Sequence, residues 1–74
     1  MTTRRQIITE RLLAALGERA QRPDDERSTP ALARACATNP STARKLLCEL
    51  LEARRVTSTY KRIEHRATRV WWLR

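Results

Sequence analysis

The sequence predicts a small, mostly helical α+β domain in which three helices precede a C-terminal two-stranded β-hairpin. Up to about residue 54, apolar side chains recur at helical spacing, whereas residues 56–73 are rich in β-branched and aromatic side chains. A hydrophobic content of 41% with a single glycine is typical of a globular helical chain and not of a disordered tail. Seventy-four residues make one domain, near the lower size limit at which a hydrophobic core alone maintains a fold.

The first helix is expected over about residues 3–18. Thr3 and Gln6 match the capping box, in which the hydroxyl and the amide side chain satisfy reciprocal backbone donors. Apolar side chains then follow at spacings of three and four, which places on one face Ile8, Leu12, Ala15 and Leu16. This face needs a cover, and we expect the next two helices to provide it in preference to a membrane surface.

Residues 19–29 are expected to form a charged linker that contains a proline. The adjacent acids Asp24, Asp25 and Glu26 raise the question of a paired-carboxylate active site. Neither a histidine, a glycine-rich loop nor a nucleophile stands near them in the sequence. We therefore expect no catalytic residue and no metal ligand here, and no enzymatic activity or cofactor in the chain.

A short second helix is expected over about residues 30–37. Ser28 or Thr29 accepts from the first free backbone N–H groups, and Pro30 supplies a fixed φ at a position that needs no donor. A narrow apolar stripe follows, made of Leu32, Ala33 and Cys36. The next break comes at Thr38, Asn39 and Pro40, because the residue before a proline is pushed out of the α region.

The third helix is expected over about residues 40–54, with Asn39 as its N-cap. Its apolar face is strong and consists of Ala43, Leu46, Leu47, Leu50 and Leu51. Its other face presents Ser41, Thr42, Arg44 and Lys45 in the N-terminal half. Hydroxyl, guanidinium and ammonium groups at this end of a helix are those that reach base edges and phosphates in a DNA major groove.

After Arg55 the composition predicts an antiparallel hairpin with strands near residues 56–62 and 67–73. The connection, KRIEHRA, is expected to be long and basic, with a tip that carries Lys61, Arg62, His65 and Arg66. Alternation places against the helices one of two pairs, Val70 with Trp72 or Trp71 with Leu73, and the sequence does not decide between them. The remaining tryptophan either contacts a second copy or a base, or both tryptophans are largely covered by the first helix.

The segment LARACATNPSTARKLLCELLEARRV, residues 32–56, resembles the helix-turn-helix of winged-helix DNA-binding regulators, and the resemblance extends over roughly residues 28–73. It implies that the third helix enters the major groove, with Arg44 in a bidentate contact to guanine, and that the hairpin is a basic wing. The chain departs from the family at Ala37 and Arg54, where such proteins often have glycine. A left-handed Arg54 would cost about 1 kcal/mol, so the helix is expected to end differently, about one residue later.

For the wing, the resemblance implies that Lys61, Arg62 and Arg66 touch phosphates or the adjacent minor groove. His65 is a poor metal-ligand candidate by itself and is expected to contact phosphate from the tip, if it has a role. Ser28 or Thr29, at the start of the second helix, would add a contact to the DNA backbone.

The charge distribution agrees with a nucleic-acid partner. The net charge is +8 and the isoelectric point is near 11.3. Residues 1–53 carry nine basic and seven acidic side chains, whereas residues 54–74 carry seven basic and one acidic. A strong positive field favours a polyanion, and the C-terminal third is the expected contact surface.

The same data predict the setting of the protein. No apolar run has the length of a membrane span and no cleavable leader is recognisable, so we expect a cytoplasmic, nucleoid-associated protein without membrane contact. Cys36 and Cys48 are too few for a disulfide framework and lack the spacing of a zinc site. A homodimer or a tandem array on DNA is compatible with the sequence, and no small-molecule ligand is expected in so small a domain.

The predicted function is sequence-specific binding of double-stranded DNA by a small transcriptional regulator. Three alternatives stay open at this point. The chain is also similar to phage excisionases, which are basic winged-helix proteins that bend DNA and assist a recombinase. A basic face and an aromatic strand also suit an RNA-binding or ribosome-associated winged helix. The third alternative is a protein-interaction module in which the charge is incidental.

Overall fold

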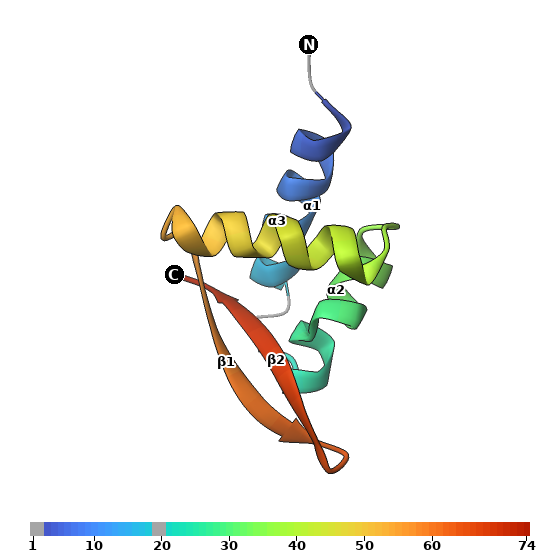
Figure 1. The fold of residues 1–74 in the computed structure, drawn as a ribbon, viewed down its shortest axis with the longest axis vertical. Coiled ribbons are helices and arrows are strands. Elements are labelled where there is room, and N and C mark those ends of the chain that lie inside the picture. Colours follow the sequence, from blue (N-terminus) through green and yellow to red (C-terminus); the bar gives the residue numbers. More distant parts are fainter. Residues whose placement is uncertain (1–2, 19–20) are drawn as a thin grey trace.

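The computed structural model describes residues 3–18 and 21–74 and shows a mostly helical α+β domain, as predicted. Its elements are α1 (Arg4–Glu18), a 3₁₀ helix η1 (Asp24–Arg27), α2 (Thr29–Ala35), α3 (Pro40–Glu52), β1 (Val56–Ile63) and β2 (Arg66–Leu73). The first two residues of the predicted linker 19–29 lie outside the described residues. In Figure 1, α3 lies across the molecule, α1 extends to one side of it and the hairpin to the other. None of the described helices combines the length and the apolarity that crossing a bilayer requires.

The three predicted helix starts are confirmed by their hydrogen bonds. The Thr3 N–H donates to Gln6 Oε1 at 3.0 Å and the Gln6 N–H donates to Thr3 Oγ1 at 3.2 Å, which completes the capping box. The Ser28 side chain caps α2, and the Thr42 N–H donates to Asn39 Oδ1 at 2.8 Å at the start of α3. Each cap of this type contributes about 1 kcal/mol, because it satisfies a backbone donor that the helix leaves free.

The expected end of the third helix was wrong. Helix α3 ends at Glu52, and Arg54 adopts the left-handed conformation with φ of 60°. The Arg54 N–H donates to the Leu51 carbonyl at 3.0 Å, and the Arg55 N–H donates to the Leu50 carbonyl at 2.9 Å. These two bonds form a Schellman motif, and by capturing two otherwise free carbonyls they offset the cost of about 1 kcal/mol for a left-handed non-glycine residue.

Helix α2 ends in the same way and two residues earlier than expected, at Ala35. Ala37 has φ of 53°. Its N–H donates to the Arg34 carbonyl at 3.2 Å, and the Thr38 N–H donates to the Ala33 carbonyl at 2.9 Å. The C-terminal ends of α2 and α3 are therefore both stabilised by backbone bonds that compensate for the missing glycine.

The predicted hairpin is present, but its connection is shorter than expected. The antiparallel ladder continues as far as the pair of Ile63 with Arg66, so only Glu64 and His65 lie between the strands. Both have positive φ, 49° and 67°, as the central residues of a type I′ turn require. The expectation of a long basic connection was wrong because most of its residues pair across the ladder.

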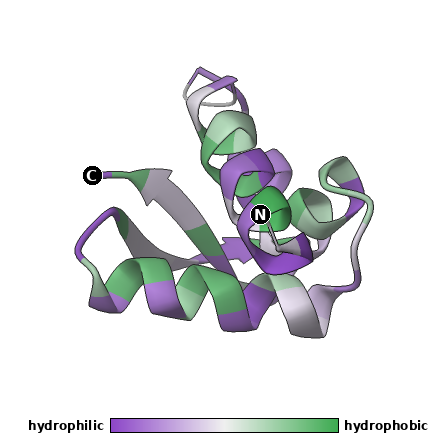
Figure 2. Ribbon diagram, turned by 90° about the horizontal axis from the view of Figure 1, so that it is seen from above, coloured by the Kyte–Doolittle hydropathy of each residue, from purple (hydrophilic) through white to green (hydrophobic). Residues whose placement is uncertain are grey.

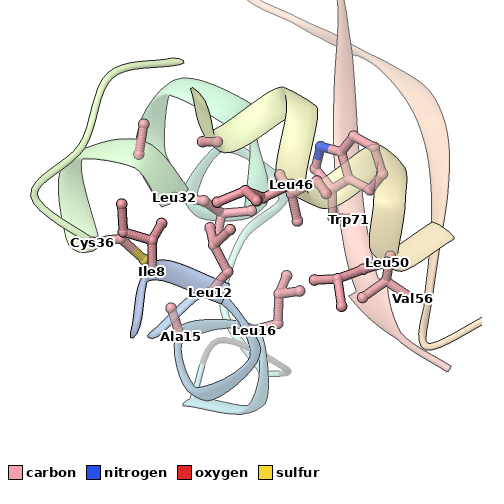
Figure 3. Packing of buried hydrophobic residues seen from close by; sticks show 13 residues of the cluster. Ile8, Leu12, Ala15, Leu16, Leu32, Cys36, Leu46, Leu50, Val56 and Trp71 are labelled. Atoms are coloured by element: carbon pink, nitrogen blue, oxygen red, sulfur yellow. The ribbon is translucent and has the colours of Figure 1, made fainter. Parts of the chain in front are cut away.

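The core lies where the three α-helices meet one face of the hairpin. Its members come from all of these elements, and Figure 3 shows Leu12 and Leu16 of α1, Leu46 and Leu50 of α3, and Trp71 of β2 gathered together. Figure 2 shows short hydrophobic and hydrophilic blocks alternating along α3, as expected for a helix with one buried face.

Trp71 settles which strand face packs on the helices. Its side chain is completely buried, and its indole Nε1–H donates to Thr29 Oγ1 at the start of α2 at 3.0 Å. Trp71 and Leu73 therefore share the strand side that faces the helices, although only Trp71 is buried there and Leu73 is 45% exposed. A buried indole N–H needs such an acceptor, so this bond also fixes α2 relative to the hairpin.

The other face of β2 is covered near η1, which the sequence did not predict. Ser28 pairs with Val70 as an isolated antiparallel bridge along the edge of β2 that β1 leaves free, and Val70 is buried. The Arg27 guanidinium lies 4.9 Å from the ring centre of Trp72, and it also pairs with Asp24. Trp72 is thus half-buried under a cation that stacks on its ring.

Candidate nucleic-acid interface

The exposed surface of α3 contains the four residues predicted to contact bases. The helix buries Ala43, Leu46, Leu47 and Leu50 in the core. Ser41, Arg44 and Lys45 are exposed and Thr42 is half-buried. Helical geometry places Arg44 on one flank of this exposed surface, Thr42 on the other flank, and Ser41 and Lys45 between them.

The C-terminal half of the same surface is acidic, a property that the sequence reading missed. Glu49 and Glu52 are both exposed, and the Arg5 side chain of α1 pairs with Glu49. The hydrogen bond from Arg5 holds the pKa of Glu49 below its ordinary value, with the charges of Arg5 and Lys45 acting in the same direction and partial desolvation opposing them. The pKa of Arg5 is raised, mainly by the same hydrogen bond. The cations of α3 itself, Arg44 and Lys45, therefore lie only in its N-terminal half, which favours a polyanion there.

A shallow hollow runs along this surface between α3 and the start of α2. It is bordered on the α2 side by Thr29 and Pro30, and on the α3 side by residues that include Ser41, Arg44 and Cys48. Because Thr29 also accepts the bond from Trp71, the α2 side of the hollow is joined to the hairpin. One side-chain hydrogen bond therefore links the hollow beside α3 to the hairpin.

The structure divides the predicted hairpin residues between two faces. Arg62 is paired with Ala67, and residues paired in register point to the same side, so Arg62 shares the helix-facing side with Trp71. Lys61 and Arg66 point to the opposite side, and all three cations are exposed. His65 is exposed in the turn. The four residues lie near one end of the molecule but do not form one surface.

Arg69 and Tyr60 are further candidates that the sequence reading missed. They are paired across the ladder on the helix-facing side. The Arg69 guanidinium lies 4.5 Å from the ring centre of Trp71 and 5.8 Å from that of Tyr60, and its Nε–H donates to Ser58 Oγ at 3.2 Å. Tyr60 is 67% exposed. The result is an immobilised cation beside an exposed aromatic ring, which suits contact with a sugar-phosphate backbone or a base.

The two-residue period of a strand is the sequence feature that could have identified Arg69 and Tyr60 as candidates. Once Trp71 faces inward, Arg69 must share its side, and the register then adds Tyr60. The choice between the two tryptophan pairs was open, so this step was not accessible from the sequence.

The two regions lie apart in the molecule. Figure 1 shows α3 lying across the middle of the molecule, with the hairpin extending away from it and α2 beside the hairpin. A ligand that contacts α3 and the hairpin turn together must therefore be long, as a nucleic-acid duplex is.

The described residues contain no group of three or more His, Cys, Asp or Glu side chains that could hold a metal ion. The cysteines are free thiols, with Cys36 buried in the core and Cys48 half-buried on α3. Comparison of the chain with protein-family models, with curated proteins and with solved structures gave no match.

Proposed function

We propose that the chain is a winged helix-turn-helix domain that binds double-stranded DNA and acts as a small transcriptional regulator. The observation that carries the proposal is the division of the exposed surface of α3, where hydroxyls and cations occupy the N-terminal half and acids the C-terminal half. A recognition helix inserts its N-terminal residues into the major groove, and this distribution favours that orientation.

The arrangement of elements supports the same proposal. Two capped helices joined by a tight turn are followed directly by a hairpin, in the order that a winged helix requires. The net charge of residues 54–74 is +6, and nearly all of these cations are exposed on the hairpin and its flanks. Such a surface binds phosphates with an affinity that falls steeply as salt increases.

In this proposal α3 reads the sequence. Arg44 makes the bidentate contact to guanine O6 and N7, since its guanidinium is exposed and the planar fork matches these acceptors. Ser41, Thr42 and Lys45 contact neighbouring bases and phosphates. The hairpin anchors the complex, with Arg62, Tyr60 and Arg69 facing the same side as the helices, and with Lys61, His65 and Arg66 contacting phosphates from the outer side and the turn.

The test is selection from a pool of random duplexes at two salt concentrations, followed by sequencing of the retained DNA. The proposal predicts enrichment of a short motif that persists at the higher salt. Motif symmetry then distinguishes a two-fold dimer from a tandem array. Structured RNA is added as a competitor in a parallel arm. Retention that selects no motif, or that structured RNA abolishes at equal nucleotide concentration, would contradict the proposal.

A further inference from the structure

A second hollow lies on the other flank of α3, where the beginning of α1 meets the N-terminal end of that helix. Two buried apolar residues, Ile8 and Leu46, form part of its lining. The polar residues around it are Arg4, Arg5, Thr38, Asn39, Thr42 and Lys45. It lies on the other side of Lys45 from the hollow beside Thr29 and Pro30, since Lys45 lines both, and it contains two arginines that the proposed function does not use.

The charges around this hollow are positive. Three cations from two different helices line it and no carboxylate does. The nearby Glu49 carboxylate is engaged by Arg5. Within residues 3–18 and 21–74, neither Arg4 nor Lys45 forms an ion pair or a side-chain hydrogen bond, and the Lys45 charge acts on Glu49 only at a distance, so both ends can still contact a ligand. An anion placed here is attracted by the charges of both Arg4 and Lys45.

The neutral polar groups add donors. Asn39 Oδ1 accepts the Thr42 N–H at 2.8 Å, so the oxygen of this amide is occupied and its NH₂ group is the part that remains to donate. Thr38 and Thr42 also line the hollow, and a threonine hydroxyl can donate. Several neutral donors beside two available cations match an anion with several acceptor oxygens, and a phosphate group is such an anion.

We propose that this hollow is a phosphate-binding site and, resting on the proposed function, that it holds a backbone phosphodiester of the bound duplex. The hairpin and α1 extend to opposite sides of α3 in Figure 1. A recognition helix in the major groove is flanked by two phosphate backbones. The hairpin thus anchors one backbone, while Arg4 and Lys45 anchor the other.

The experiment compares Arg4→Ala with Arg11→Ala, because Arg11 is also an exposed arginine of α1 but does not line the hollow. Both variants remove one charge and neither removes a core side chain. Binding to a random duplex is measured over a series of salt concentrations. In addition, ¹⁵N-labelled protein is titrated with inorganic phosphate and with a short duplex, and the amide shifts of Thr38 and Thr42 are followed.

Removing one phosphate contact lowers the slope of log K against log salt by about one. We therefore expect this decrease for Arg4→Ala, with the Thr38 and Thr42 shifts weakened, and no decrease for Arg11→Ala. If the unmodified protein binds duplex but the two variants behave alike in slope and in shifts, the phosphate site is wrong and the proposed function stands. If duplex never binds but phosphate shifts both amides in an Arg4-dependent manner, the site is real for free phosphate and the proposed function is wrong.

Discussion

At the scale of single residues, Ala37 carries a strain that glycine would relieve. It holds φ of 53° at the end of α2, a conformation that costs a non-glycine residue about 1 kcal/mol. Ala37→Gly is therefore expected to raise the free energy of unfolding by up to about 1 kcal/mol, measured by urea denaturation. The matched control is Ala14→Gly in the interior of α1, which is expected to lower it by about the same amount. A loss of stability in both variants would show that Ala37 is not strained.

Residue-level chemistry was predictable where a side chain acts within one turn. Thr3 and Asn39 were identified as caps, and the cap of the second helix was narrowed to Ser28 or Thr29, because a hydroxyl or amide oxygen reaches only the nearest free N–H groups. The left-handed Arg54 was not predicted, because the cost of its positive φ was expected to exceed the gain from closing the helix there. Two carbonyls captured by the following N–H groups reverse that balance.

At the scale of elements, α1 contains a residue of low helix propensity, Gly17, where it packs against β2. Gly17 lies in α1, and a β-carbon added to it would lie 3.5 Å from Leu73 Cδ1, an ordinary van der Waals distance. Gly17→Ala is expected to stabilise the protein by roughly 0.5–1 kcal/mol, since alanine is the better helix former. Urea denaturation measures this gain. Measuring the effect of Gly17→Ala again in a Leu73→Ala background shows how much of the gain comes from the new contact with Leu73. A lower midpoint for Gly17→Ala would contradict the packing of α1 on β2.

The pair of Arg5 with Glu49 joins α1 to α3 and makes part of the stability depend on pH. The folded state lowers the pKa of Glu49, mainly through the hydrogen bond from Arg5. The contribution is therefore fully present above the ordinary glutamate pKa and is lost as pH falls through the lowered value. We expect Arg5→Ala to differ most from the unmodified protein at neutral pH and to converge with it in acid, when unfolding is measured across a pH series. Both side chains are about half-exposed, so the difference is small, and a difference independent of pH would contradict this role.

Elements were predictable where their pattern is local. All three α-helices and both strands lie close to the expected ranges, because apolar periodicity and capping residues define them. Helix η1 was not predicted, since the local pair of Arg27 with Asp24 is accompanied by a tertiary contact of Arg27 with Trp72 that the sequence does not reveal. The two-residue turn was missed because Glu64 and His65 are not the Asn-Gly type that signals a type I′ turn.

The candidate site was likewise predictable only where the pattern is local. The helical period correctly predicted that Ser41, Arg44 and Lys45 are exposed. Which side of the hairpin carries Arg62, and which carries Lys61 and Arg66, depends on Trp71 facing the helices, and the sequence did not decide this.

At the scale of the whole molecule, the charges define three cationic regions around α3. The helix-facing side of the hairpin carries Arg62 and Arg69, the start of α3 carries Arg44 and Lys45, and the start of α1 adds Arg4. This arrangement matches a groove with a phosphate backbone on each side. The exposed acids Glu49 and Glu52 lie in the C-terminal half of α3, and under the proposed function they would oppose a duplex approaching in the wrong orientation.

The central claim is that α3 reads sequence while the hairpin anchors the backbone. The most direct test measures the binding of Arg44→Ala and Arg66→Ala to a selected duplex and to a random one at two salt concentrations. Arg44→Ala is expected to lose about 1–3 kcal/mol on the selected duplex and to discriminate less, whereas Arg66→Ala should weaken both duplexes equally and lower the salt slope by about one. Equal losses by both variants on both duplexes would contradict the assignment of reading to α3.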